Sequence, residues 1–364
     1  IKAVRGKIIS KKPTKILFIM GIILIVAYFF LFQFGYTSVF YNYDTGKMDT
    51  VSGFAAIEQR KETANMFAGK LTPDLLTLME QRITEAQTAT ATKDENSAFS
   101  ALHVYRDQAA ILEYMTEPDG EMKSIEEAYP NHESIILGYC DGWDKMLSSM
   151  GNVLAILLCL LVVITLSPVF SVLYSCHTDS VIYVARYGQT KLVTAKIIAS
   201  LETVIGMYIV FMLLNAALYM GIYGVQGWNV NIQSSLHYAS STYDLTFLQM
   251  FLISVALNIL GLIAMTIITL FISAKLNAPV TALIASCVVC FLPVLFDFSE
   301  SVPLLQKLQE VCPIFMLHMN GVFTSVKTYM GIQQPVIMFL FNLCLICLFY
   351  FLIRNTTKKH QVMG

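Results

Sequence analysis

The sequence predicts an all-α membrane protein, with six transmembrane helices and a mostly helical extracytoplasmic domain inserted between the first and the second. Apolar residues make up 56% of the chain and charged residues only 13%, whereas soluble domains contain about 45–50% and ~25% of these classes. A soluble protein could not bury so much apolar surface, so lipid must be the solvent for much of the chain. The inserted domain is indicated by a long charged stretch between the first two apolar runs.

Six apolar runs are long enough to cross a hydrocarbon core of ~30 Å as helices. They are Ile16–Phe34, Val153–Tyr174, Leu192–Tyr219, Phe247–Ser273, Pro279–Phe298 and Pro335–Ile353. The first run follows basic residues, as the core of a secretory signal does, but it is longer and no small-residue cleavage site follows it, so we expect a retained span. The expected organisation is a cytoplasmic amphipathic segment, a first span, an outer domain, a five-span core and a cytoplasmic tail, at residues 1–15, 16–35, 36–148, 149–354 and 355–364.

The distribution of Lys and Arg predicts that both termini lie in the cytoplasm, because short loops rich in these residues stay inside. The loop at 221–246 has no Lys or Arg, and the segment 299–334 has only Lys307 and Lys327. The basic residues gather instead before the first span, around the start of the third, in the turn after the fourth and in the tail: Lys2, Arg5, Lys7, Lys11, Lys12, Lys15, Arg186, Lys191, Lys196, Lys275, Arg354, Lys358 and Lys359.

The segment 36–148 is acidic, with 19 Asp or Glu and 9 Lys or Arg, which gives a local net charge of −10. Apolar residues at helical spacing, such as Leu75 and Leu78, predict helices there, and Pro73 and the turn at Gly120 mark helix ends. The acidity indicates either a solvated surface or a site for a cation or a cationic peptide.

Polar residues inside spans are energetically unfavourable in lipid and are therefore candidates for function. Glu202 could pair with Lys191, Lys196 or a basic group of a neighbouring helix, or it could act in gating or cargo passage. The two interior amides are expected to form interhelical hydrogen bonds, and a proline in the fifth span is expected to kink it. The candidates for a pathway or its gate are Glu202, Asn215, Asn258, Pro293 and Asp297.

The stretch between the second and third spans predicts a short helix at about 178–187, followed by a basic entry into the third span. Thr178 or Asp179 could cap its first amides, and Gly188 suits the left-handed residue that ends a helix. A short amphipathic helix at the cytoplasmic face is suited to receive force from a soluble motor. The alternative is an ordinary interfacial loop.

Motifs for nucleotide binding or catalysis are absent from the sequence. The pair Gly69-Lys70 lacks the upstream glycine of a phosphate-binding loop, and no metalloprotease or hydrolase motif occurs. We therefore expect no enzymatic activity in this chain.

The eight cysteines predict no metal or redox site. The pairs Cys287/Cys290 and Cys344/Cys347 have a metal-site spacing but lie inside apolar runs, where Cys behaves as a small hydrophobic residue. Two others fall on the outer side in the predicted topology, so a disulfide between Cys140 and Cys312 is geometrically possible.

The turn Tyr187-Gly188-Gln189, followed by Lys196 at the base of the third span, resembles the coupling region of type-2 ATP-binding-cassette (ABC) transporter permeases. The family also has a basic amphipathic N-terminal segment, six spans and short helices that dip back into the membrane before the last span, which the stretch 311–323 resembles. Members with an enlarged outer domain after the first span are common among bacterial permeases for peptide or antibiotic export or self-immunity.

The resemblance implies a bacterial cell-membrane permease that exports a peptide, an antibiotic or another amphipathic or lipid-like substrate. Two cytoplasmic ABC ATPase subunits would bind ATP and Mg, and a second copy or a related permease would complete the pathway among membrane lipids. It implies no cofactor in this chain and no nucleic-acid partner. The residues that it assigns to ATPase coupling are Asp179, Tyr183, Arg186, Tyr187, Gly188, Lys191 and Lys196.

Other classes of membrane protein remain as alternatives. An ABC mechanotransmission or peptide-sensing permease would act through its outer domain without transport, and such proteins normally have four spans per unit. A receptor or scaffold would have no ATPase partner, and an intramembrane enzyme would show clustered catalytic groups in the spans.

Overall fold

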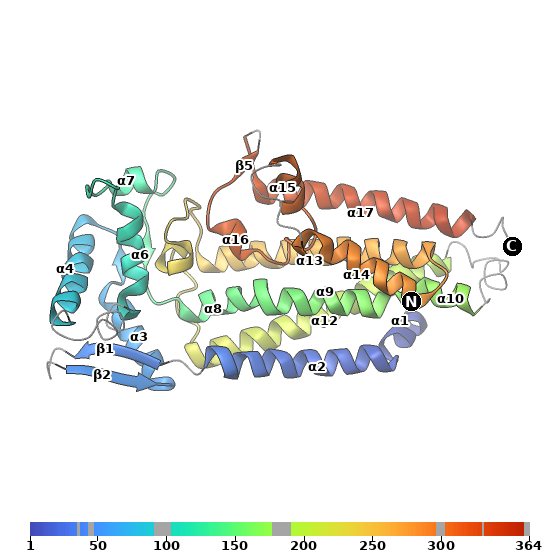
Figure 1. The fold of residues 1–364 in the computed structure, drawn as a ribbon, viewed down its shortest axis with the longest axis horizontal. Helices are drawn as coiled ribbons and strands as arrows, with labels where there is room; N and C mark the ends of the chain where they lie inside the picture. The colour runs from blue at the N-terminus through green and yellow to red at the C-terminus, as the bar shows by residue number, and fades with distance from the viewer. Residues whose placement is uncertain are drawn as a thin grey trace.

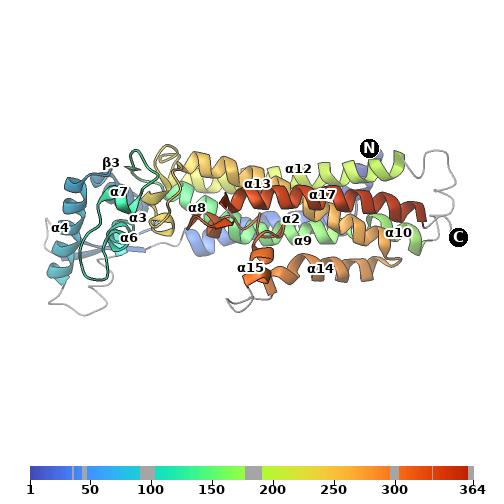
Figure 2. The ribbon, with the colours of Figure 1, turned by 90° about the horizontal axis from the view of Figure 1, so that it is seen from above.

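The computed structural model describes residues 1–34, 37–42, 47–90, 103–176, 191–295, 303–329 and 331–359, and the chain is mostly helical there. Figure 1 shows an elongated molecule in which long helices run side by side along the long axis, and a smaller domain covers one end. We call it the outer domain for this place in the molecule, the end that it covers the outer end, and the opposite end the inner end. The view turned by 90° shows the same division (Figure 2). Helix α1 (Lys2–Ile9) and the last turns of α17 (Gln334–Lys359) lie at the other end.

Five helices of the described chain are long and apolar enough to cross a membrane. Such helices satisfy all their backbone polar groups internally, as lipid requires. They are α2 (Lys12–Tyr28) with the π-helical turn η1 (Phe29–Gln33), the helix Asp141–Ser175, α12 (Lys191–Tyr223), α13 (Phe247–Lys275) and α17.

The fifth span expected from the sequence coincides with a shorter helix. Helix α14 (Pro279–Leu295) has 17 residues and is therefore about 26 Å long, slightly less than a hydrocarbon core of ~30 Å. The expected span ran to Phe298, but the residues after Leu295 lie outside the described part of the chain. Pro293 lies in the last turn of α14.

The second span is longer than the sequence predicts, because its helix begins at Asp141 rather than Val153. Its parts are α8 (Asp141–Ser149), the π-helical turn η3 (Met150–Leu154), α9 (Ala155–Leu166) and α10 (Pro168–Ser175). Of its most apolar stretch 72% is buried, against 67% for α13, 44% for α12 and 17% for α2 and α17. This helix, called the central helix below, is therefore the most buried of the five.

The outer domain combines helices with short antiparallel strand pairs. Its helices are α3 (Phe54–Met66), α4 (Pro73–Thr90), η2 (His103–Tyr105), α6 (Arg106–Met115) and α7 (Ile125–Ala128). Strand β1 (Thr37–Asn42) pairs with β2 (Lys47–Ser52), and β3 (Gly69–Lys70) pairs with β4 (Ile136–Leu137). The prediction of a mostly helical domain is correct, but it did not include these strands.

The outer domain has its own apolar core, separate from that of the bundle. Leu76 and Met79 of α4 pack there with Ile111 and Met115 of α6 and with Tyr129. The Tyr129 hydroxyl donates to the carbonyl of Ala239 (2.7 Å), in the loop between α12 and α13. Burial raises the pKa of Tyr129. The domain is thus bonded to the outer end of the bundle as well as to the chain on either side of it.

Two outer connections also pack on the bundle. The loop from α12 to α13 contains the short 3₁₀ turns η4 (Ile232–Ser234) and η5 (Leu236–Tyr238). The connection from α14 to α17 contains α15 (Pro303–Glu310), α16 (Asn320–Phe323) and the strands β5 (Thr328–Tyr329) and β6 (Ile332–Gln333). Within it Val311, Met316, Leu317, Val322 and Phe323 are buried in the core of the bundle, so the stretch 311–323, the inserted segment below, folds back between the long helices.

Candidate functional site: the central helix and its two ends

The central helix joins the outer domain to the end of the bundle where α1 lies (Figure 1). Its 35 residues give it a length of about 52 Å, so it exceeds a hydrocarbon core of ~30 Å. Two places interrupt its hydrogen-bond ladder, the π-helical turn η3 and the break at Ser167-Pro168. Neighbouring elements bind the helix at both of these places and at its outer end.

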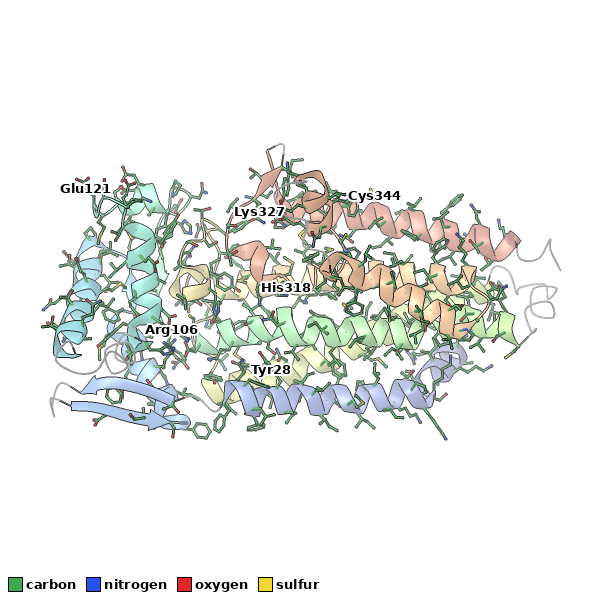
Figure 3. All side chains as sticks on the ribbon, viewed as in Figure 1. Tyr28, Arg106, Glu121, His318, Lys327 and Cys344 are labelled. Carbon is green, nitrogen blue, oxygen red and sulfur yellow. The ribbon has the colours of Figure 1, made fainter. Side chains whose placement is uncertain are left out.

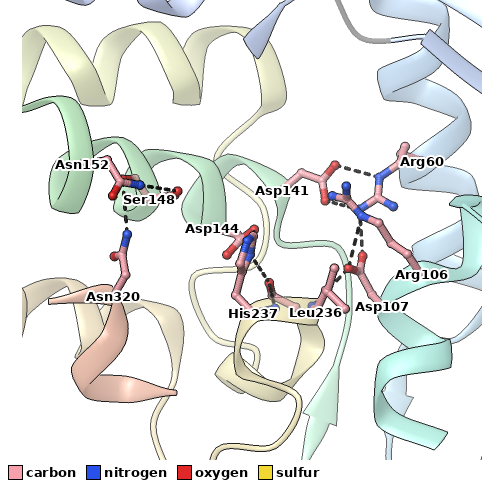
Figure 4. A network of polar contacts seen from close by, with 11 residues as sticks. Arg60, Arg106, Asp107, Asp141, Asp144, Ser148, Asn152, Leu236, His237 and Asn320 are labelled. Atoms are coloured by element: carbon pink, nitrogen blue, oxygen red, sulfur yellow. Dashed lines mark hydrogen bonds and ion pairs between the residues drawn. The ribbon is translucent and has the colours of Figure 1, made fainter. Parts of the chain in front are cut away.

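A buried ion-pair network holds the outer end of the central helix (Figure 4). Arg60 of α3 is 5% exposed, and its guanidinium donates to both carboxylate oxygens of Asp141, at 2.7 and 3.0 Å. The same Arg60 donates to Asp107 of α6 at 2.7 Å. Because Asp141 is the first residue of the central helix, this bidentate pair attaches the outer domain directly to that helix.

The network continues into the loop between α12 and α13. The backbone amide of Leu236 donates to the second carboxylate oxygen of Asp107 at 3.1 Å. One helical turn after Asp141, Asp144 accepts a hydrogen bond from Nδ1 of His237 at 3.2 Å. This hydrogen bond and the charge of Asp144 raise the pKa of His237. The outer domain, the central helix and this loop therefore meet in one polar junction (Figure 4).

The inserted segment hydrogen-bonds to two backbone carbonyls of the central helix, one in the π-helical turn and one just before it. A π turn displaces the regular i to i−4 bonds and is frequent at functional positions. The ring of His318 lies between the inserted segment and the central helix (Figure 3), and its Nδ1 donates to the carbonyl of Gly151. Asn320 donates to the carbonyl of Ser148 at 3.3 Å.

The two span amides expected to bond between helices do so. Asn215 of α12 accepts from the Ser149 hydroxyl at 2.9 Å and donates to the carbonyl of Met146 at 3.2 Å. The Asn258 amide of α13 lies 3.4 Å from the Tyr208 hydroxyl. In the orientation that satisfies both of its polar atoms, it also donates to the carbonyl of Met316 at 2.6 Å. Asn215 therefore joins α12 to the central helix next to η3, and Asn258 joins α13 to α12 and to the inserted segment.

At the inner end of the central helix, a serine of α13 caps α10. The first amides of a helix lack partners within it, and Pro168 prevents a regular continuation from α9. The Ser273 hydroxyl accepts from the amides of Phe170 and Ser171, at 3.0 and 3.2 Å, and donates to the carbonyl of Ser167 at 2.6 Å. Ser273 therefore performs the part of an N-cap from a neighbouring helix.

Lys196, a predicted coupling residue, binds the same break. Its side chain is buried, and its ammonium donates to the carbonyl of Val169 at 2.6 Å and lies 4.6 Å from the centre of the Phe170 ring. Helices α12 and α13 thus both bind the first turn of α10, about two turns before the segment at 177–190. We call this break, with Ser273 and Lys196, the hinge. Lys191, the first residue of α12, is exposed.

Replacing Ser273 with alanine is expected to lower the stability of α10 by about 1–3 kcal/mol, because two amides and a carbonyl lose their partner in an apolar interior. The matched control is Ser254→Ala, on the same helix, because the buried Ser254 hydroxyl has no hydrogen-bond partner among the described residues. Hydrogen exchange of α10 amides in detergent would measure the difference. Equal protection in the two variants would contradict the capping role.

Glu202 pairs with a residue of the N-terminal helix rather than with the lysines of its own helix. Its carboxylate lies 3.1 Å from the Arg5 guanidinium of α1, and both side chains are partly exposed, at 38% and 44%. Glu202 thus has a basic partner on a neighbouring helix, which was one of the expected alternatives. Lys196, another alternative, instead donates to the carbonyl of Val169 in the hinge. In water such a pair contributes about 0–1 kcal/mol, so it positions α1 more than it stabilises the bundle.

The remaining predicted site residues are partly outside the described chain. Asp179, Tyr183, Arg186, Tyr187 and Gly188 lie in 177–190, and Asp297 lies in 296–302, neither of which is described. The carbonyl of Pro293 accepts from the Gln309 side chain at 2.5 Å, which links α14 to α15. Cys140 and Cys312 are not bonded to each other.

A cavity of about 380 Å³ opens between the central helix, α14 and the inserted segment. Most of its wall is apolar, from residues such as Ile156, Phe291 and Phe315, while Asn152 and His318 supply polar groups. Ile156 and Val294 are 58% and 55% exposed, so the cavity opens at the side of the bundle. Its size and lining suit an amphipathic molecule.

Sequence reasoning singled out Lys196 of the hinge, but not the residues of the junction or the π turn, nor Ser273 and the break at Ser167-Pro168. Some signals were available: Asp141 and Asp144 stand one turn apart just before an apolar run, and Ser167-Pro168 interrupts that run. Nothing in the sequence identified Arg60 or Ser273 as their partners. Within the described residues no group of three or more His, Cys, Asp or Glu could hold a metal ion.

Comparison of the chain with models of protein families, with curated proteins and with solved structures finds no match. The class of protein therefore follows from the fold. A mostly helical chain with five helices of membrane-spanning length and composition is a membrane-associated, multi-pass protein.

Proposed function

We propose that this chain is the permease subunit of an ABC transporter of the type-2 class, which exports a peptide, antibiotic or other amphipathic substrate. The observation that carries the proposal is the hinge. Helix α10 ends at Ser175, directly before the proposed ATPase-contacting segment, and side chains of α12 and α13 hold its first turn. Motion of that segment would therefore reach three long helices at once.

The cavity beside the central helix supports a transport role. An amphipathic cargo could place its apolar part against Ile156 and Phe291 and its polar part near Asn152 and His318. Because the cavity opens at the side of the bundle, a second permease, identical or related, would close it and complete the pathway. Glu202, Asn215, Asn258 and Pro293 are not among the described residues that line this cavity, so the proposed cargo contacts differ from those first expected.

The topology that goes with this function has six spans, with α14 as the fifth, and both termini in the cytoplasm of a bacterial cell. The supporting facts are the position of α1 and of the end of α17 at one end of the bundle and the outer domain at the other. The basic residues before α2 favour the cytoplasmic side for that end. Two soluble ATPase subunits would bind ATP and Mg, and Asp179, Tyr183, Arg186, Tyr187, Gly188 and Lys191 would face them.

A second candidate function is mechanotransmission or peptide sensing without transport. The polar junction favours it, because the bidentate pair of Arg60 and Asp141 attaches the outer domain to the start of the central helix. Force from the cytoplasmic end could then work the outer domain directly. Movement of cargo into vesicles by the purified complex would support transport, and ATP-dependent change in the outer domain without such movement would support mechanotransmission.

Affinity purification of the chain from a bacterial membrane in mild detergent is expected to retain a soluble ATPase in roughly equal amount. Arg186→Ala or Tyr187→Ala is then expected to reduce cargo-stimulated ATP hydrolysis while the chain stays folded, because contact with the ATPase is weakened. Lys358→Ala, at the end of α17, is the control and should leave hydrolysis unchanged. Recovery of the chain without an ATPase, or full hydrolysis in the Arg186 and Tyr187 variants, would reject the proposed function.

A further inference from the structure

A cleft of about 430 Å³ lies between α1, α2 and α12, at the end of the bundle remote from the outer domain. Its lining changes character along its length. Arg5 of α1, Lys15 of α2 and Glu202 of α12 line one part, whereas Phe18, Met207 and Val210 line the other. The proposed transport function does not use this cleft.

The charged part lies toward the end of the bundle and the apolar part lies deeper. Along α12 the lining runs from Glu202 to Val210, a helical rise of about 12 Å. On α2, Lys15 belongs to the first turn and Phe18 to the next. A molecule in the cleft would therefore meet charge at the surface and apolar side chains below it, which is the order of groups in a membrane phospholipid.

The charges of the cleft favour an anion. Arg5 and Lys15 supply two positive charges and Glu202 one negative charge. The pair with Glu202 occupies only part of the Arg5 guanidinium, which has five N–H donors. Lys15 has no ion pair within the described part of the chain, so its ammonium is available to a phosphate.

We propose that this cleft binds an anionic phospholipid of the cytoplasmic leaflet. The phosphate lies at Arg5 and Lys15, and an acyl chain follows Phe18, Met207 and Val210. This inference rests on the cytoplasmic position of α1, not on the ABC assignment. A bound lipid would join α1 to α12 and so reinforce the weak Arg5–Glu202 pair.

A second groove, without basic residues, shows how the charges of the α1–α12 cleft would make it selective for an anionic lipid. It has about 400 Å³ and lies near the outer end of α13 and α17, with Tyr243, Leu257, Val336 and Phe339 among its lining residues, and no Lys or Arg lines it. It could take an acyl chain, but it offers no cation to a headgroup. Selectivity for an anionic lipid is therefore expected at the α1–α12 cleft and not at this groove.

Native mass spectrometry of the full chain, released from nanodiscs of phosphatidylethanolamine and phosphatidylglycerol at a ratio of about 3:1, tests the proposal. The wild-type chain is expected to retain one phosphatidylglycerol, enriched about fivefold over the bulk ratio, since a basic residue near the surface contributes ~1 kcal/mol toward an anionic lipid. Gly206→Leu should remove this lipid, because a side chain at Gly206 meets open space inside the cleft.

The matched steric control is Gly221→Leu, on the same helix, where a side chain also meets open space but does not line the cleft. This variant should retain the lipid. Lys15→Gln should lose most of the preference for phosphatidylglycerol, whereas Lys12→Gln, three residues earlier and outside the cleft lining, should keep it.

Three results would overturn the proposal: no enrichment in the wild type, equal retention in the Gly206 and Gly221 variants, or an unchanged preference in Lys15→Gln. If Gly206→Leu does not fold, the comparison of the two lysine variants decides alone. A cleft that serves only apolar packing would lose lipid in Gly206→Leu but show no difference between Lys15→Gln and the wild type.

Discussion

Replacing Arg60 with methionine is expected to reduce the local stability of the outer domain where it meets the central helix by about 3–5 kcal/mol. Removal of one partner from a buried ion-pair network leaves uncompensated buried charge, and here Asp107 and Asp141 would both lose the guanidinium that they share. Hydrogen exchange of the amides of α3, α6 and the first turns of α8, in detergent, would measure the loss.

The matched control is Arg82→Met in α4. Arg82 also pairs with a carboxylate, that of Glu85 at 3.2 Å, but both side chains are 37–40% exposed, so the loss should not exceed ~1 kcal/mol. Arg60→Lys is expected to fall between the two, because an ammonium cannot bond both oxygens of Asp141 in the planar fork of a guanidinium. Similar losses in Arg60→Met and Arg82→Met would mean that the junction is not a stabilising contact.

Replacing Gly227 with alanine is expected to destabilise the outer end of the central helix by about 2–6 kcal/mol. Gly227 has φ +93°, a region that costs an L-residue with a side chain about 1–3 kcal/mol. A Cβ there would also overlap the carbonyl oxygen of Tyr139 and lie 3.0 Å from Cα of Cys140, and overpacking of this kind adds about 1–3 kcal/mol. The obstacle is backbone, so no side chain can move aside.

Gly120→Ala is the control that separates the cost of a positive φ from the cost of steric overlap. Gly120 has φ +90°, and a Cβ there meets nothing within 4 Å, so only the conformational cost applies. Thermal unfolding of both variants in the same detergent should give a clearly lower midpoint for Gly227→Ala. Equal midpoints would show that the loop at Gly227 moves freely away from the central helix, and that the close approach is not required.

Arg60→Met and Gly227→Ala both weaken the attachment of the outer domain and of the loop between α12 and α13 to the start of the central helix. If force passes along that helix, weakening the attachment should separate events at the two ends. The hinge at Ser273 and Lys196 is the corresponding attachment at the inner end. Transport would require the hinge, whereas mechanotransmission would require both ends.

The positions of the long helices were predictable because lipid imposes one requirement on a spanning segment. Every backbone polar group must be satisfied within the segment, so a run of about 20 apolar residues becomes a helix whatever surrounds it. Helices α2, α12, α13 and α17 accordingly lie within a few residues of the expected spans. The second span was predicted from Val153, and its first part was missed because α8 carries polar residues such as Asp141 and Asp144, which are buried against other parts of the protein.

For the polar residues, the sequence predicted the chemical kind of partner but not which residue it would be. An amide in a span needs a hydrogen-bond partner, and Asn215 has one. A carboxylate needs a cation, but Glu202 binds Arg5, which is 197 positions away in the chain. Short strands such as β1 and β2 were not foreseen, because two six-residue segments become a hairpin only when their pairing and packing are both available.

Composition and the placement of apolar runs by themselves determined that this is a helical membrane protein with an inserted polar domain, because burial in lipid depends on local sequence. Only the tertiary structure decided that Arg60 meets Asp141, that Ser273 caps α10 from another helix, and that α1, α2 and α12 enclose a cleft. Each of these contacts joins residues far apart in the chain. Their formation depends on how the helices pack, which no single segment encodes.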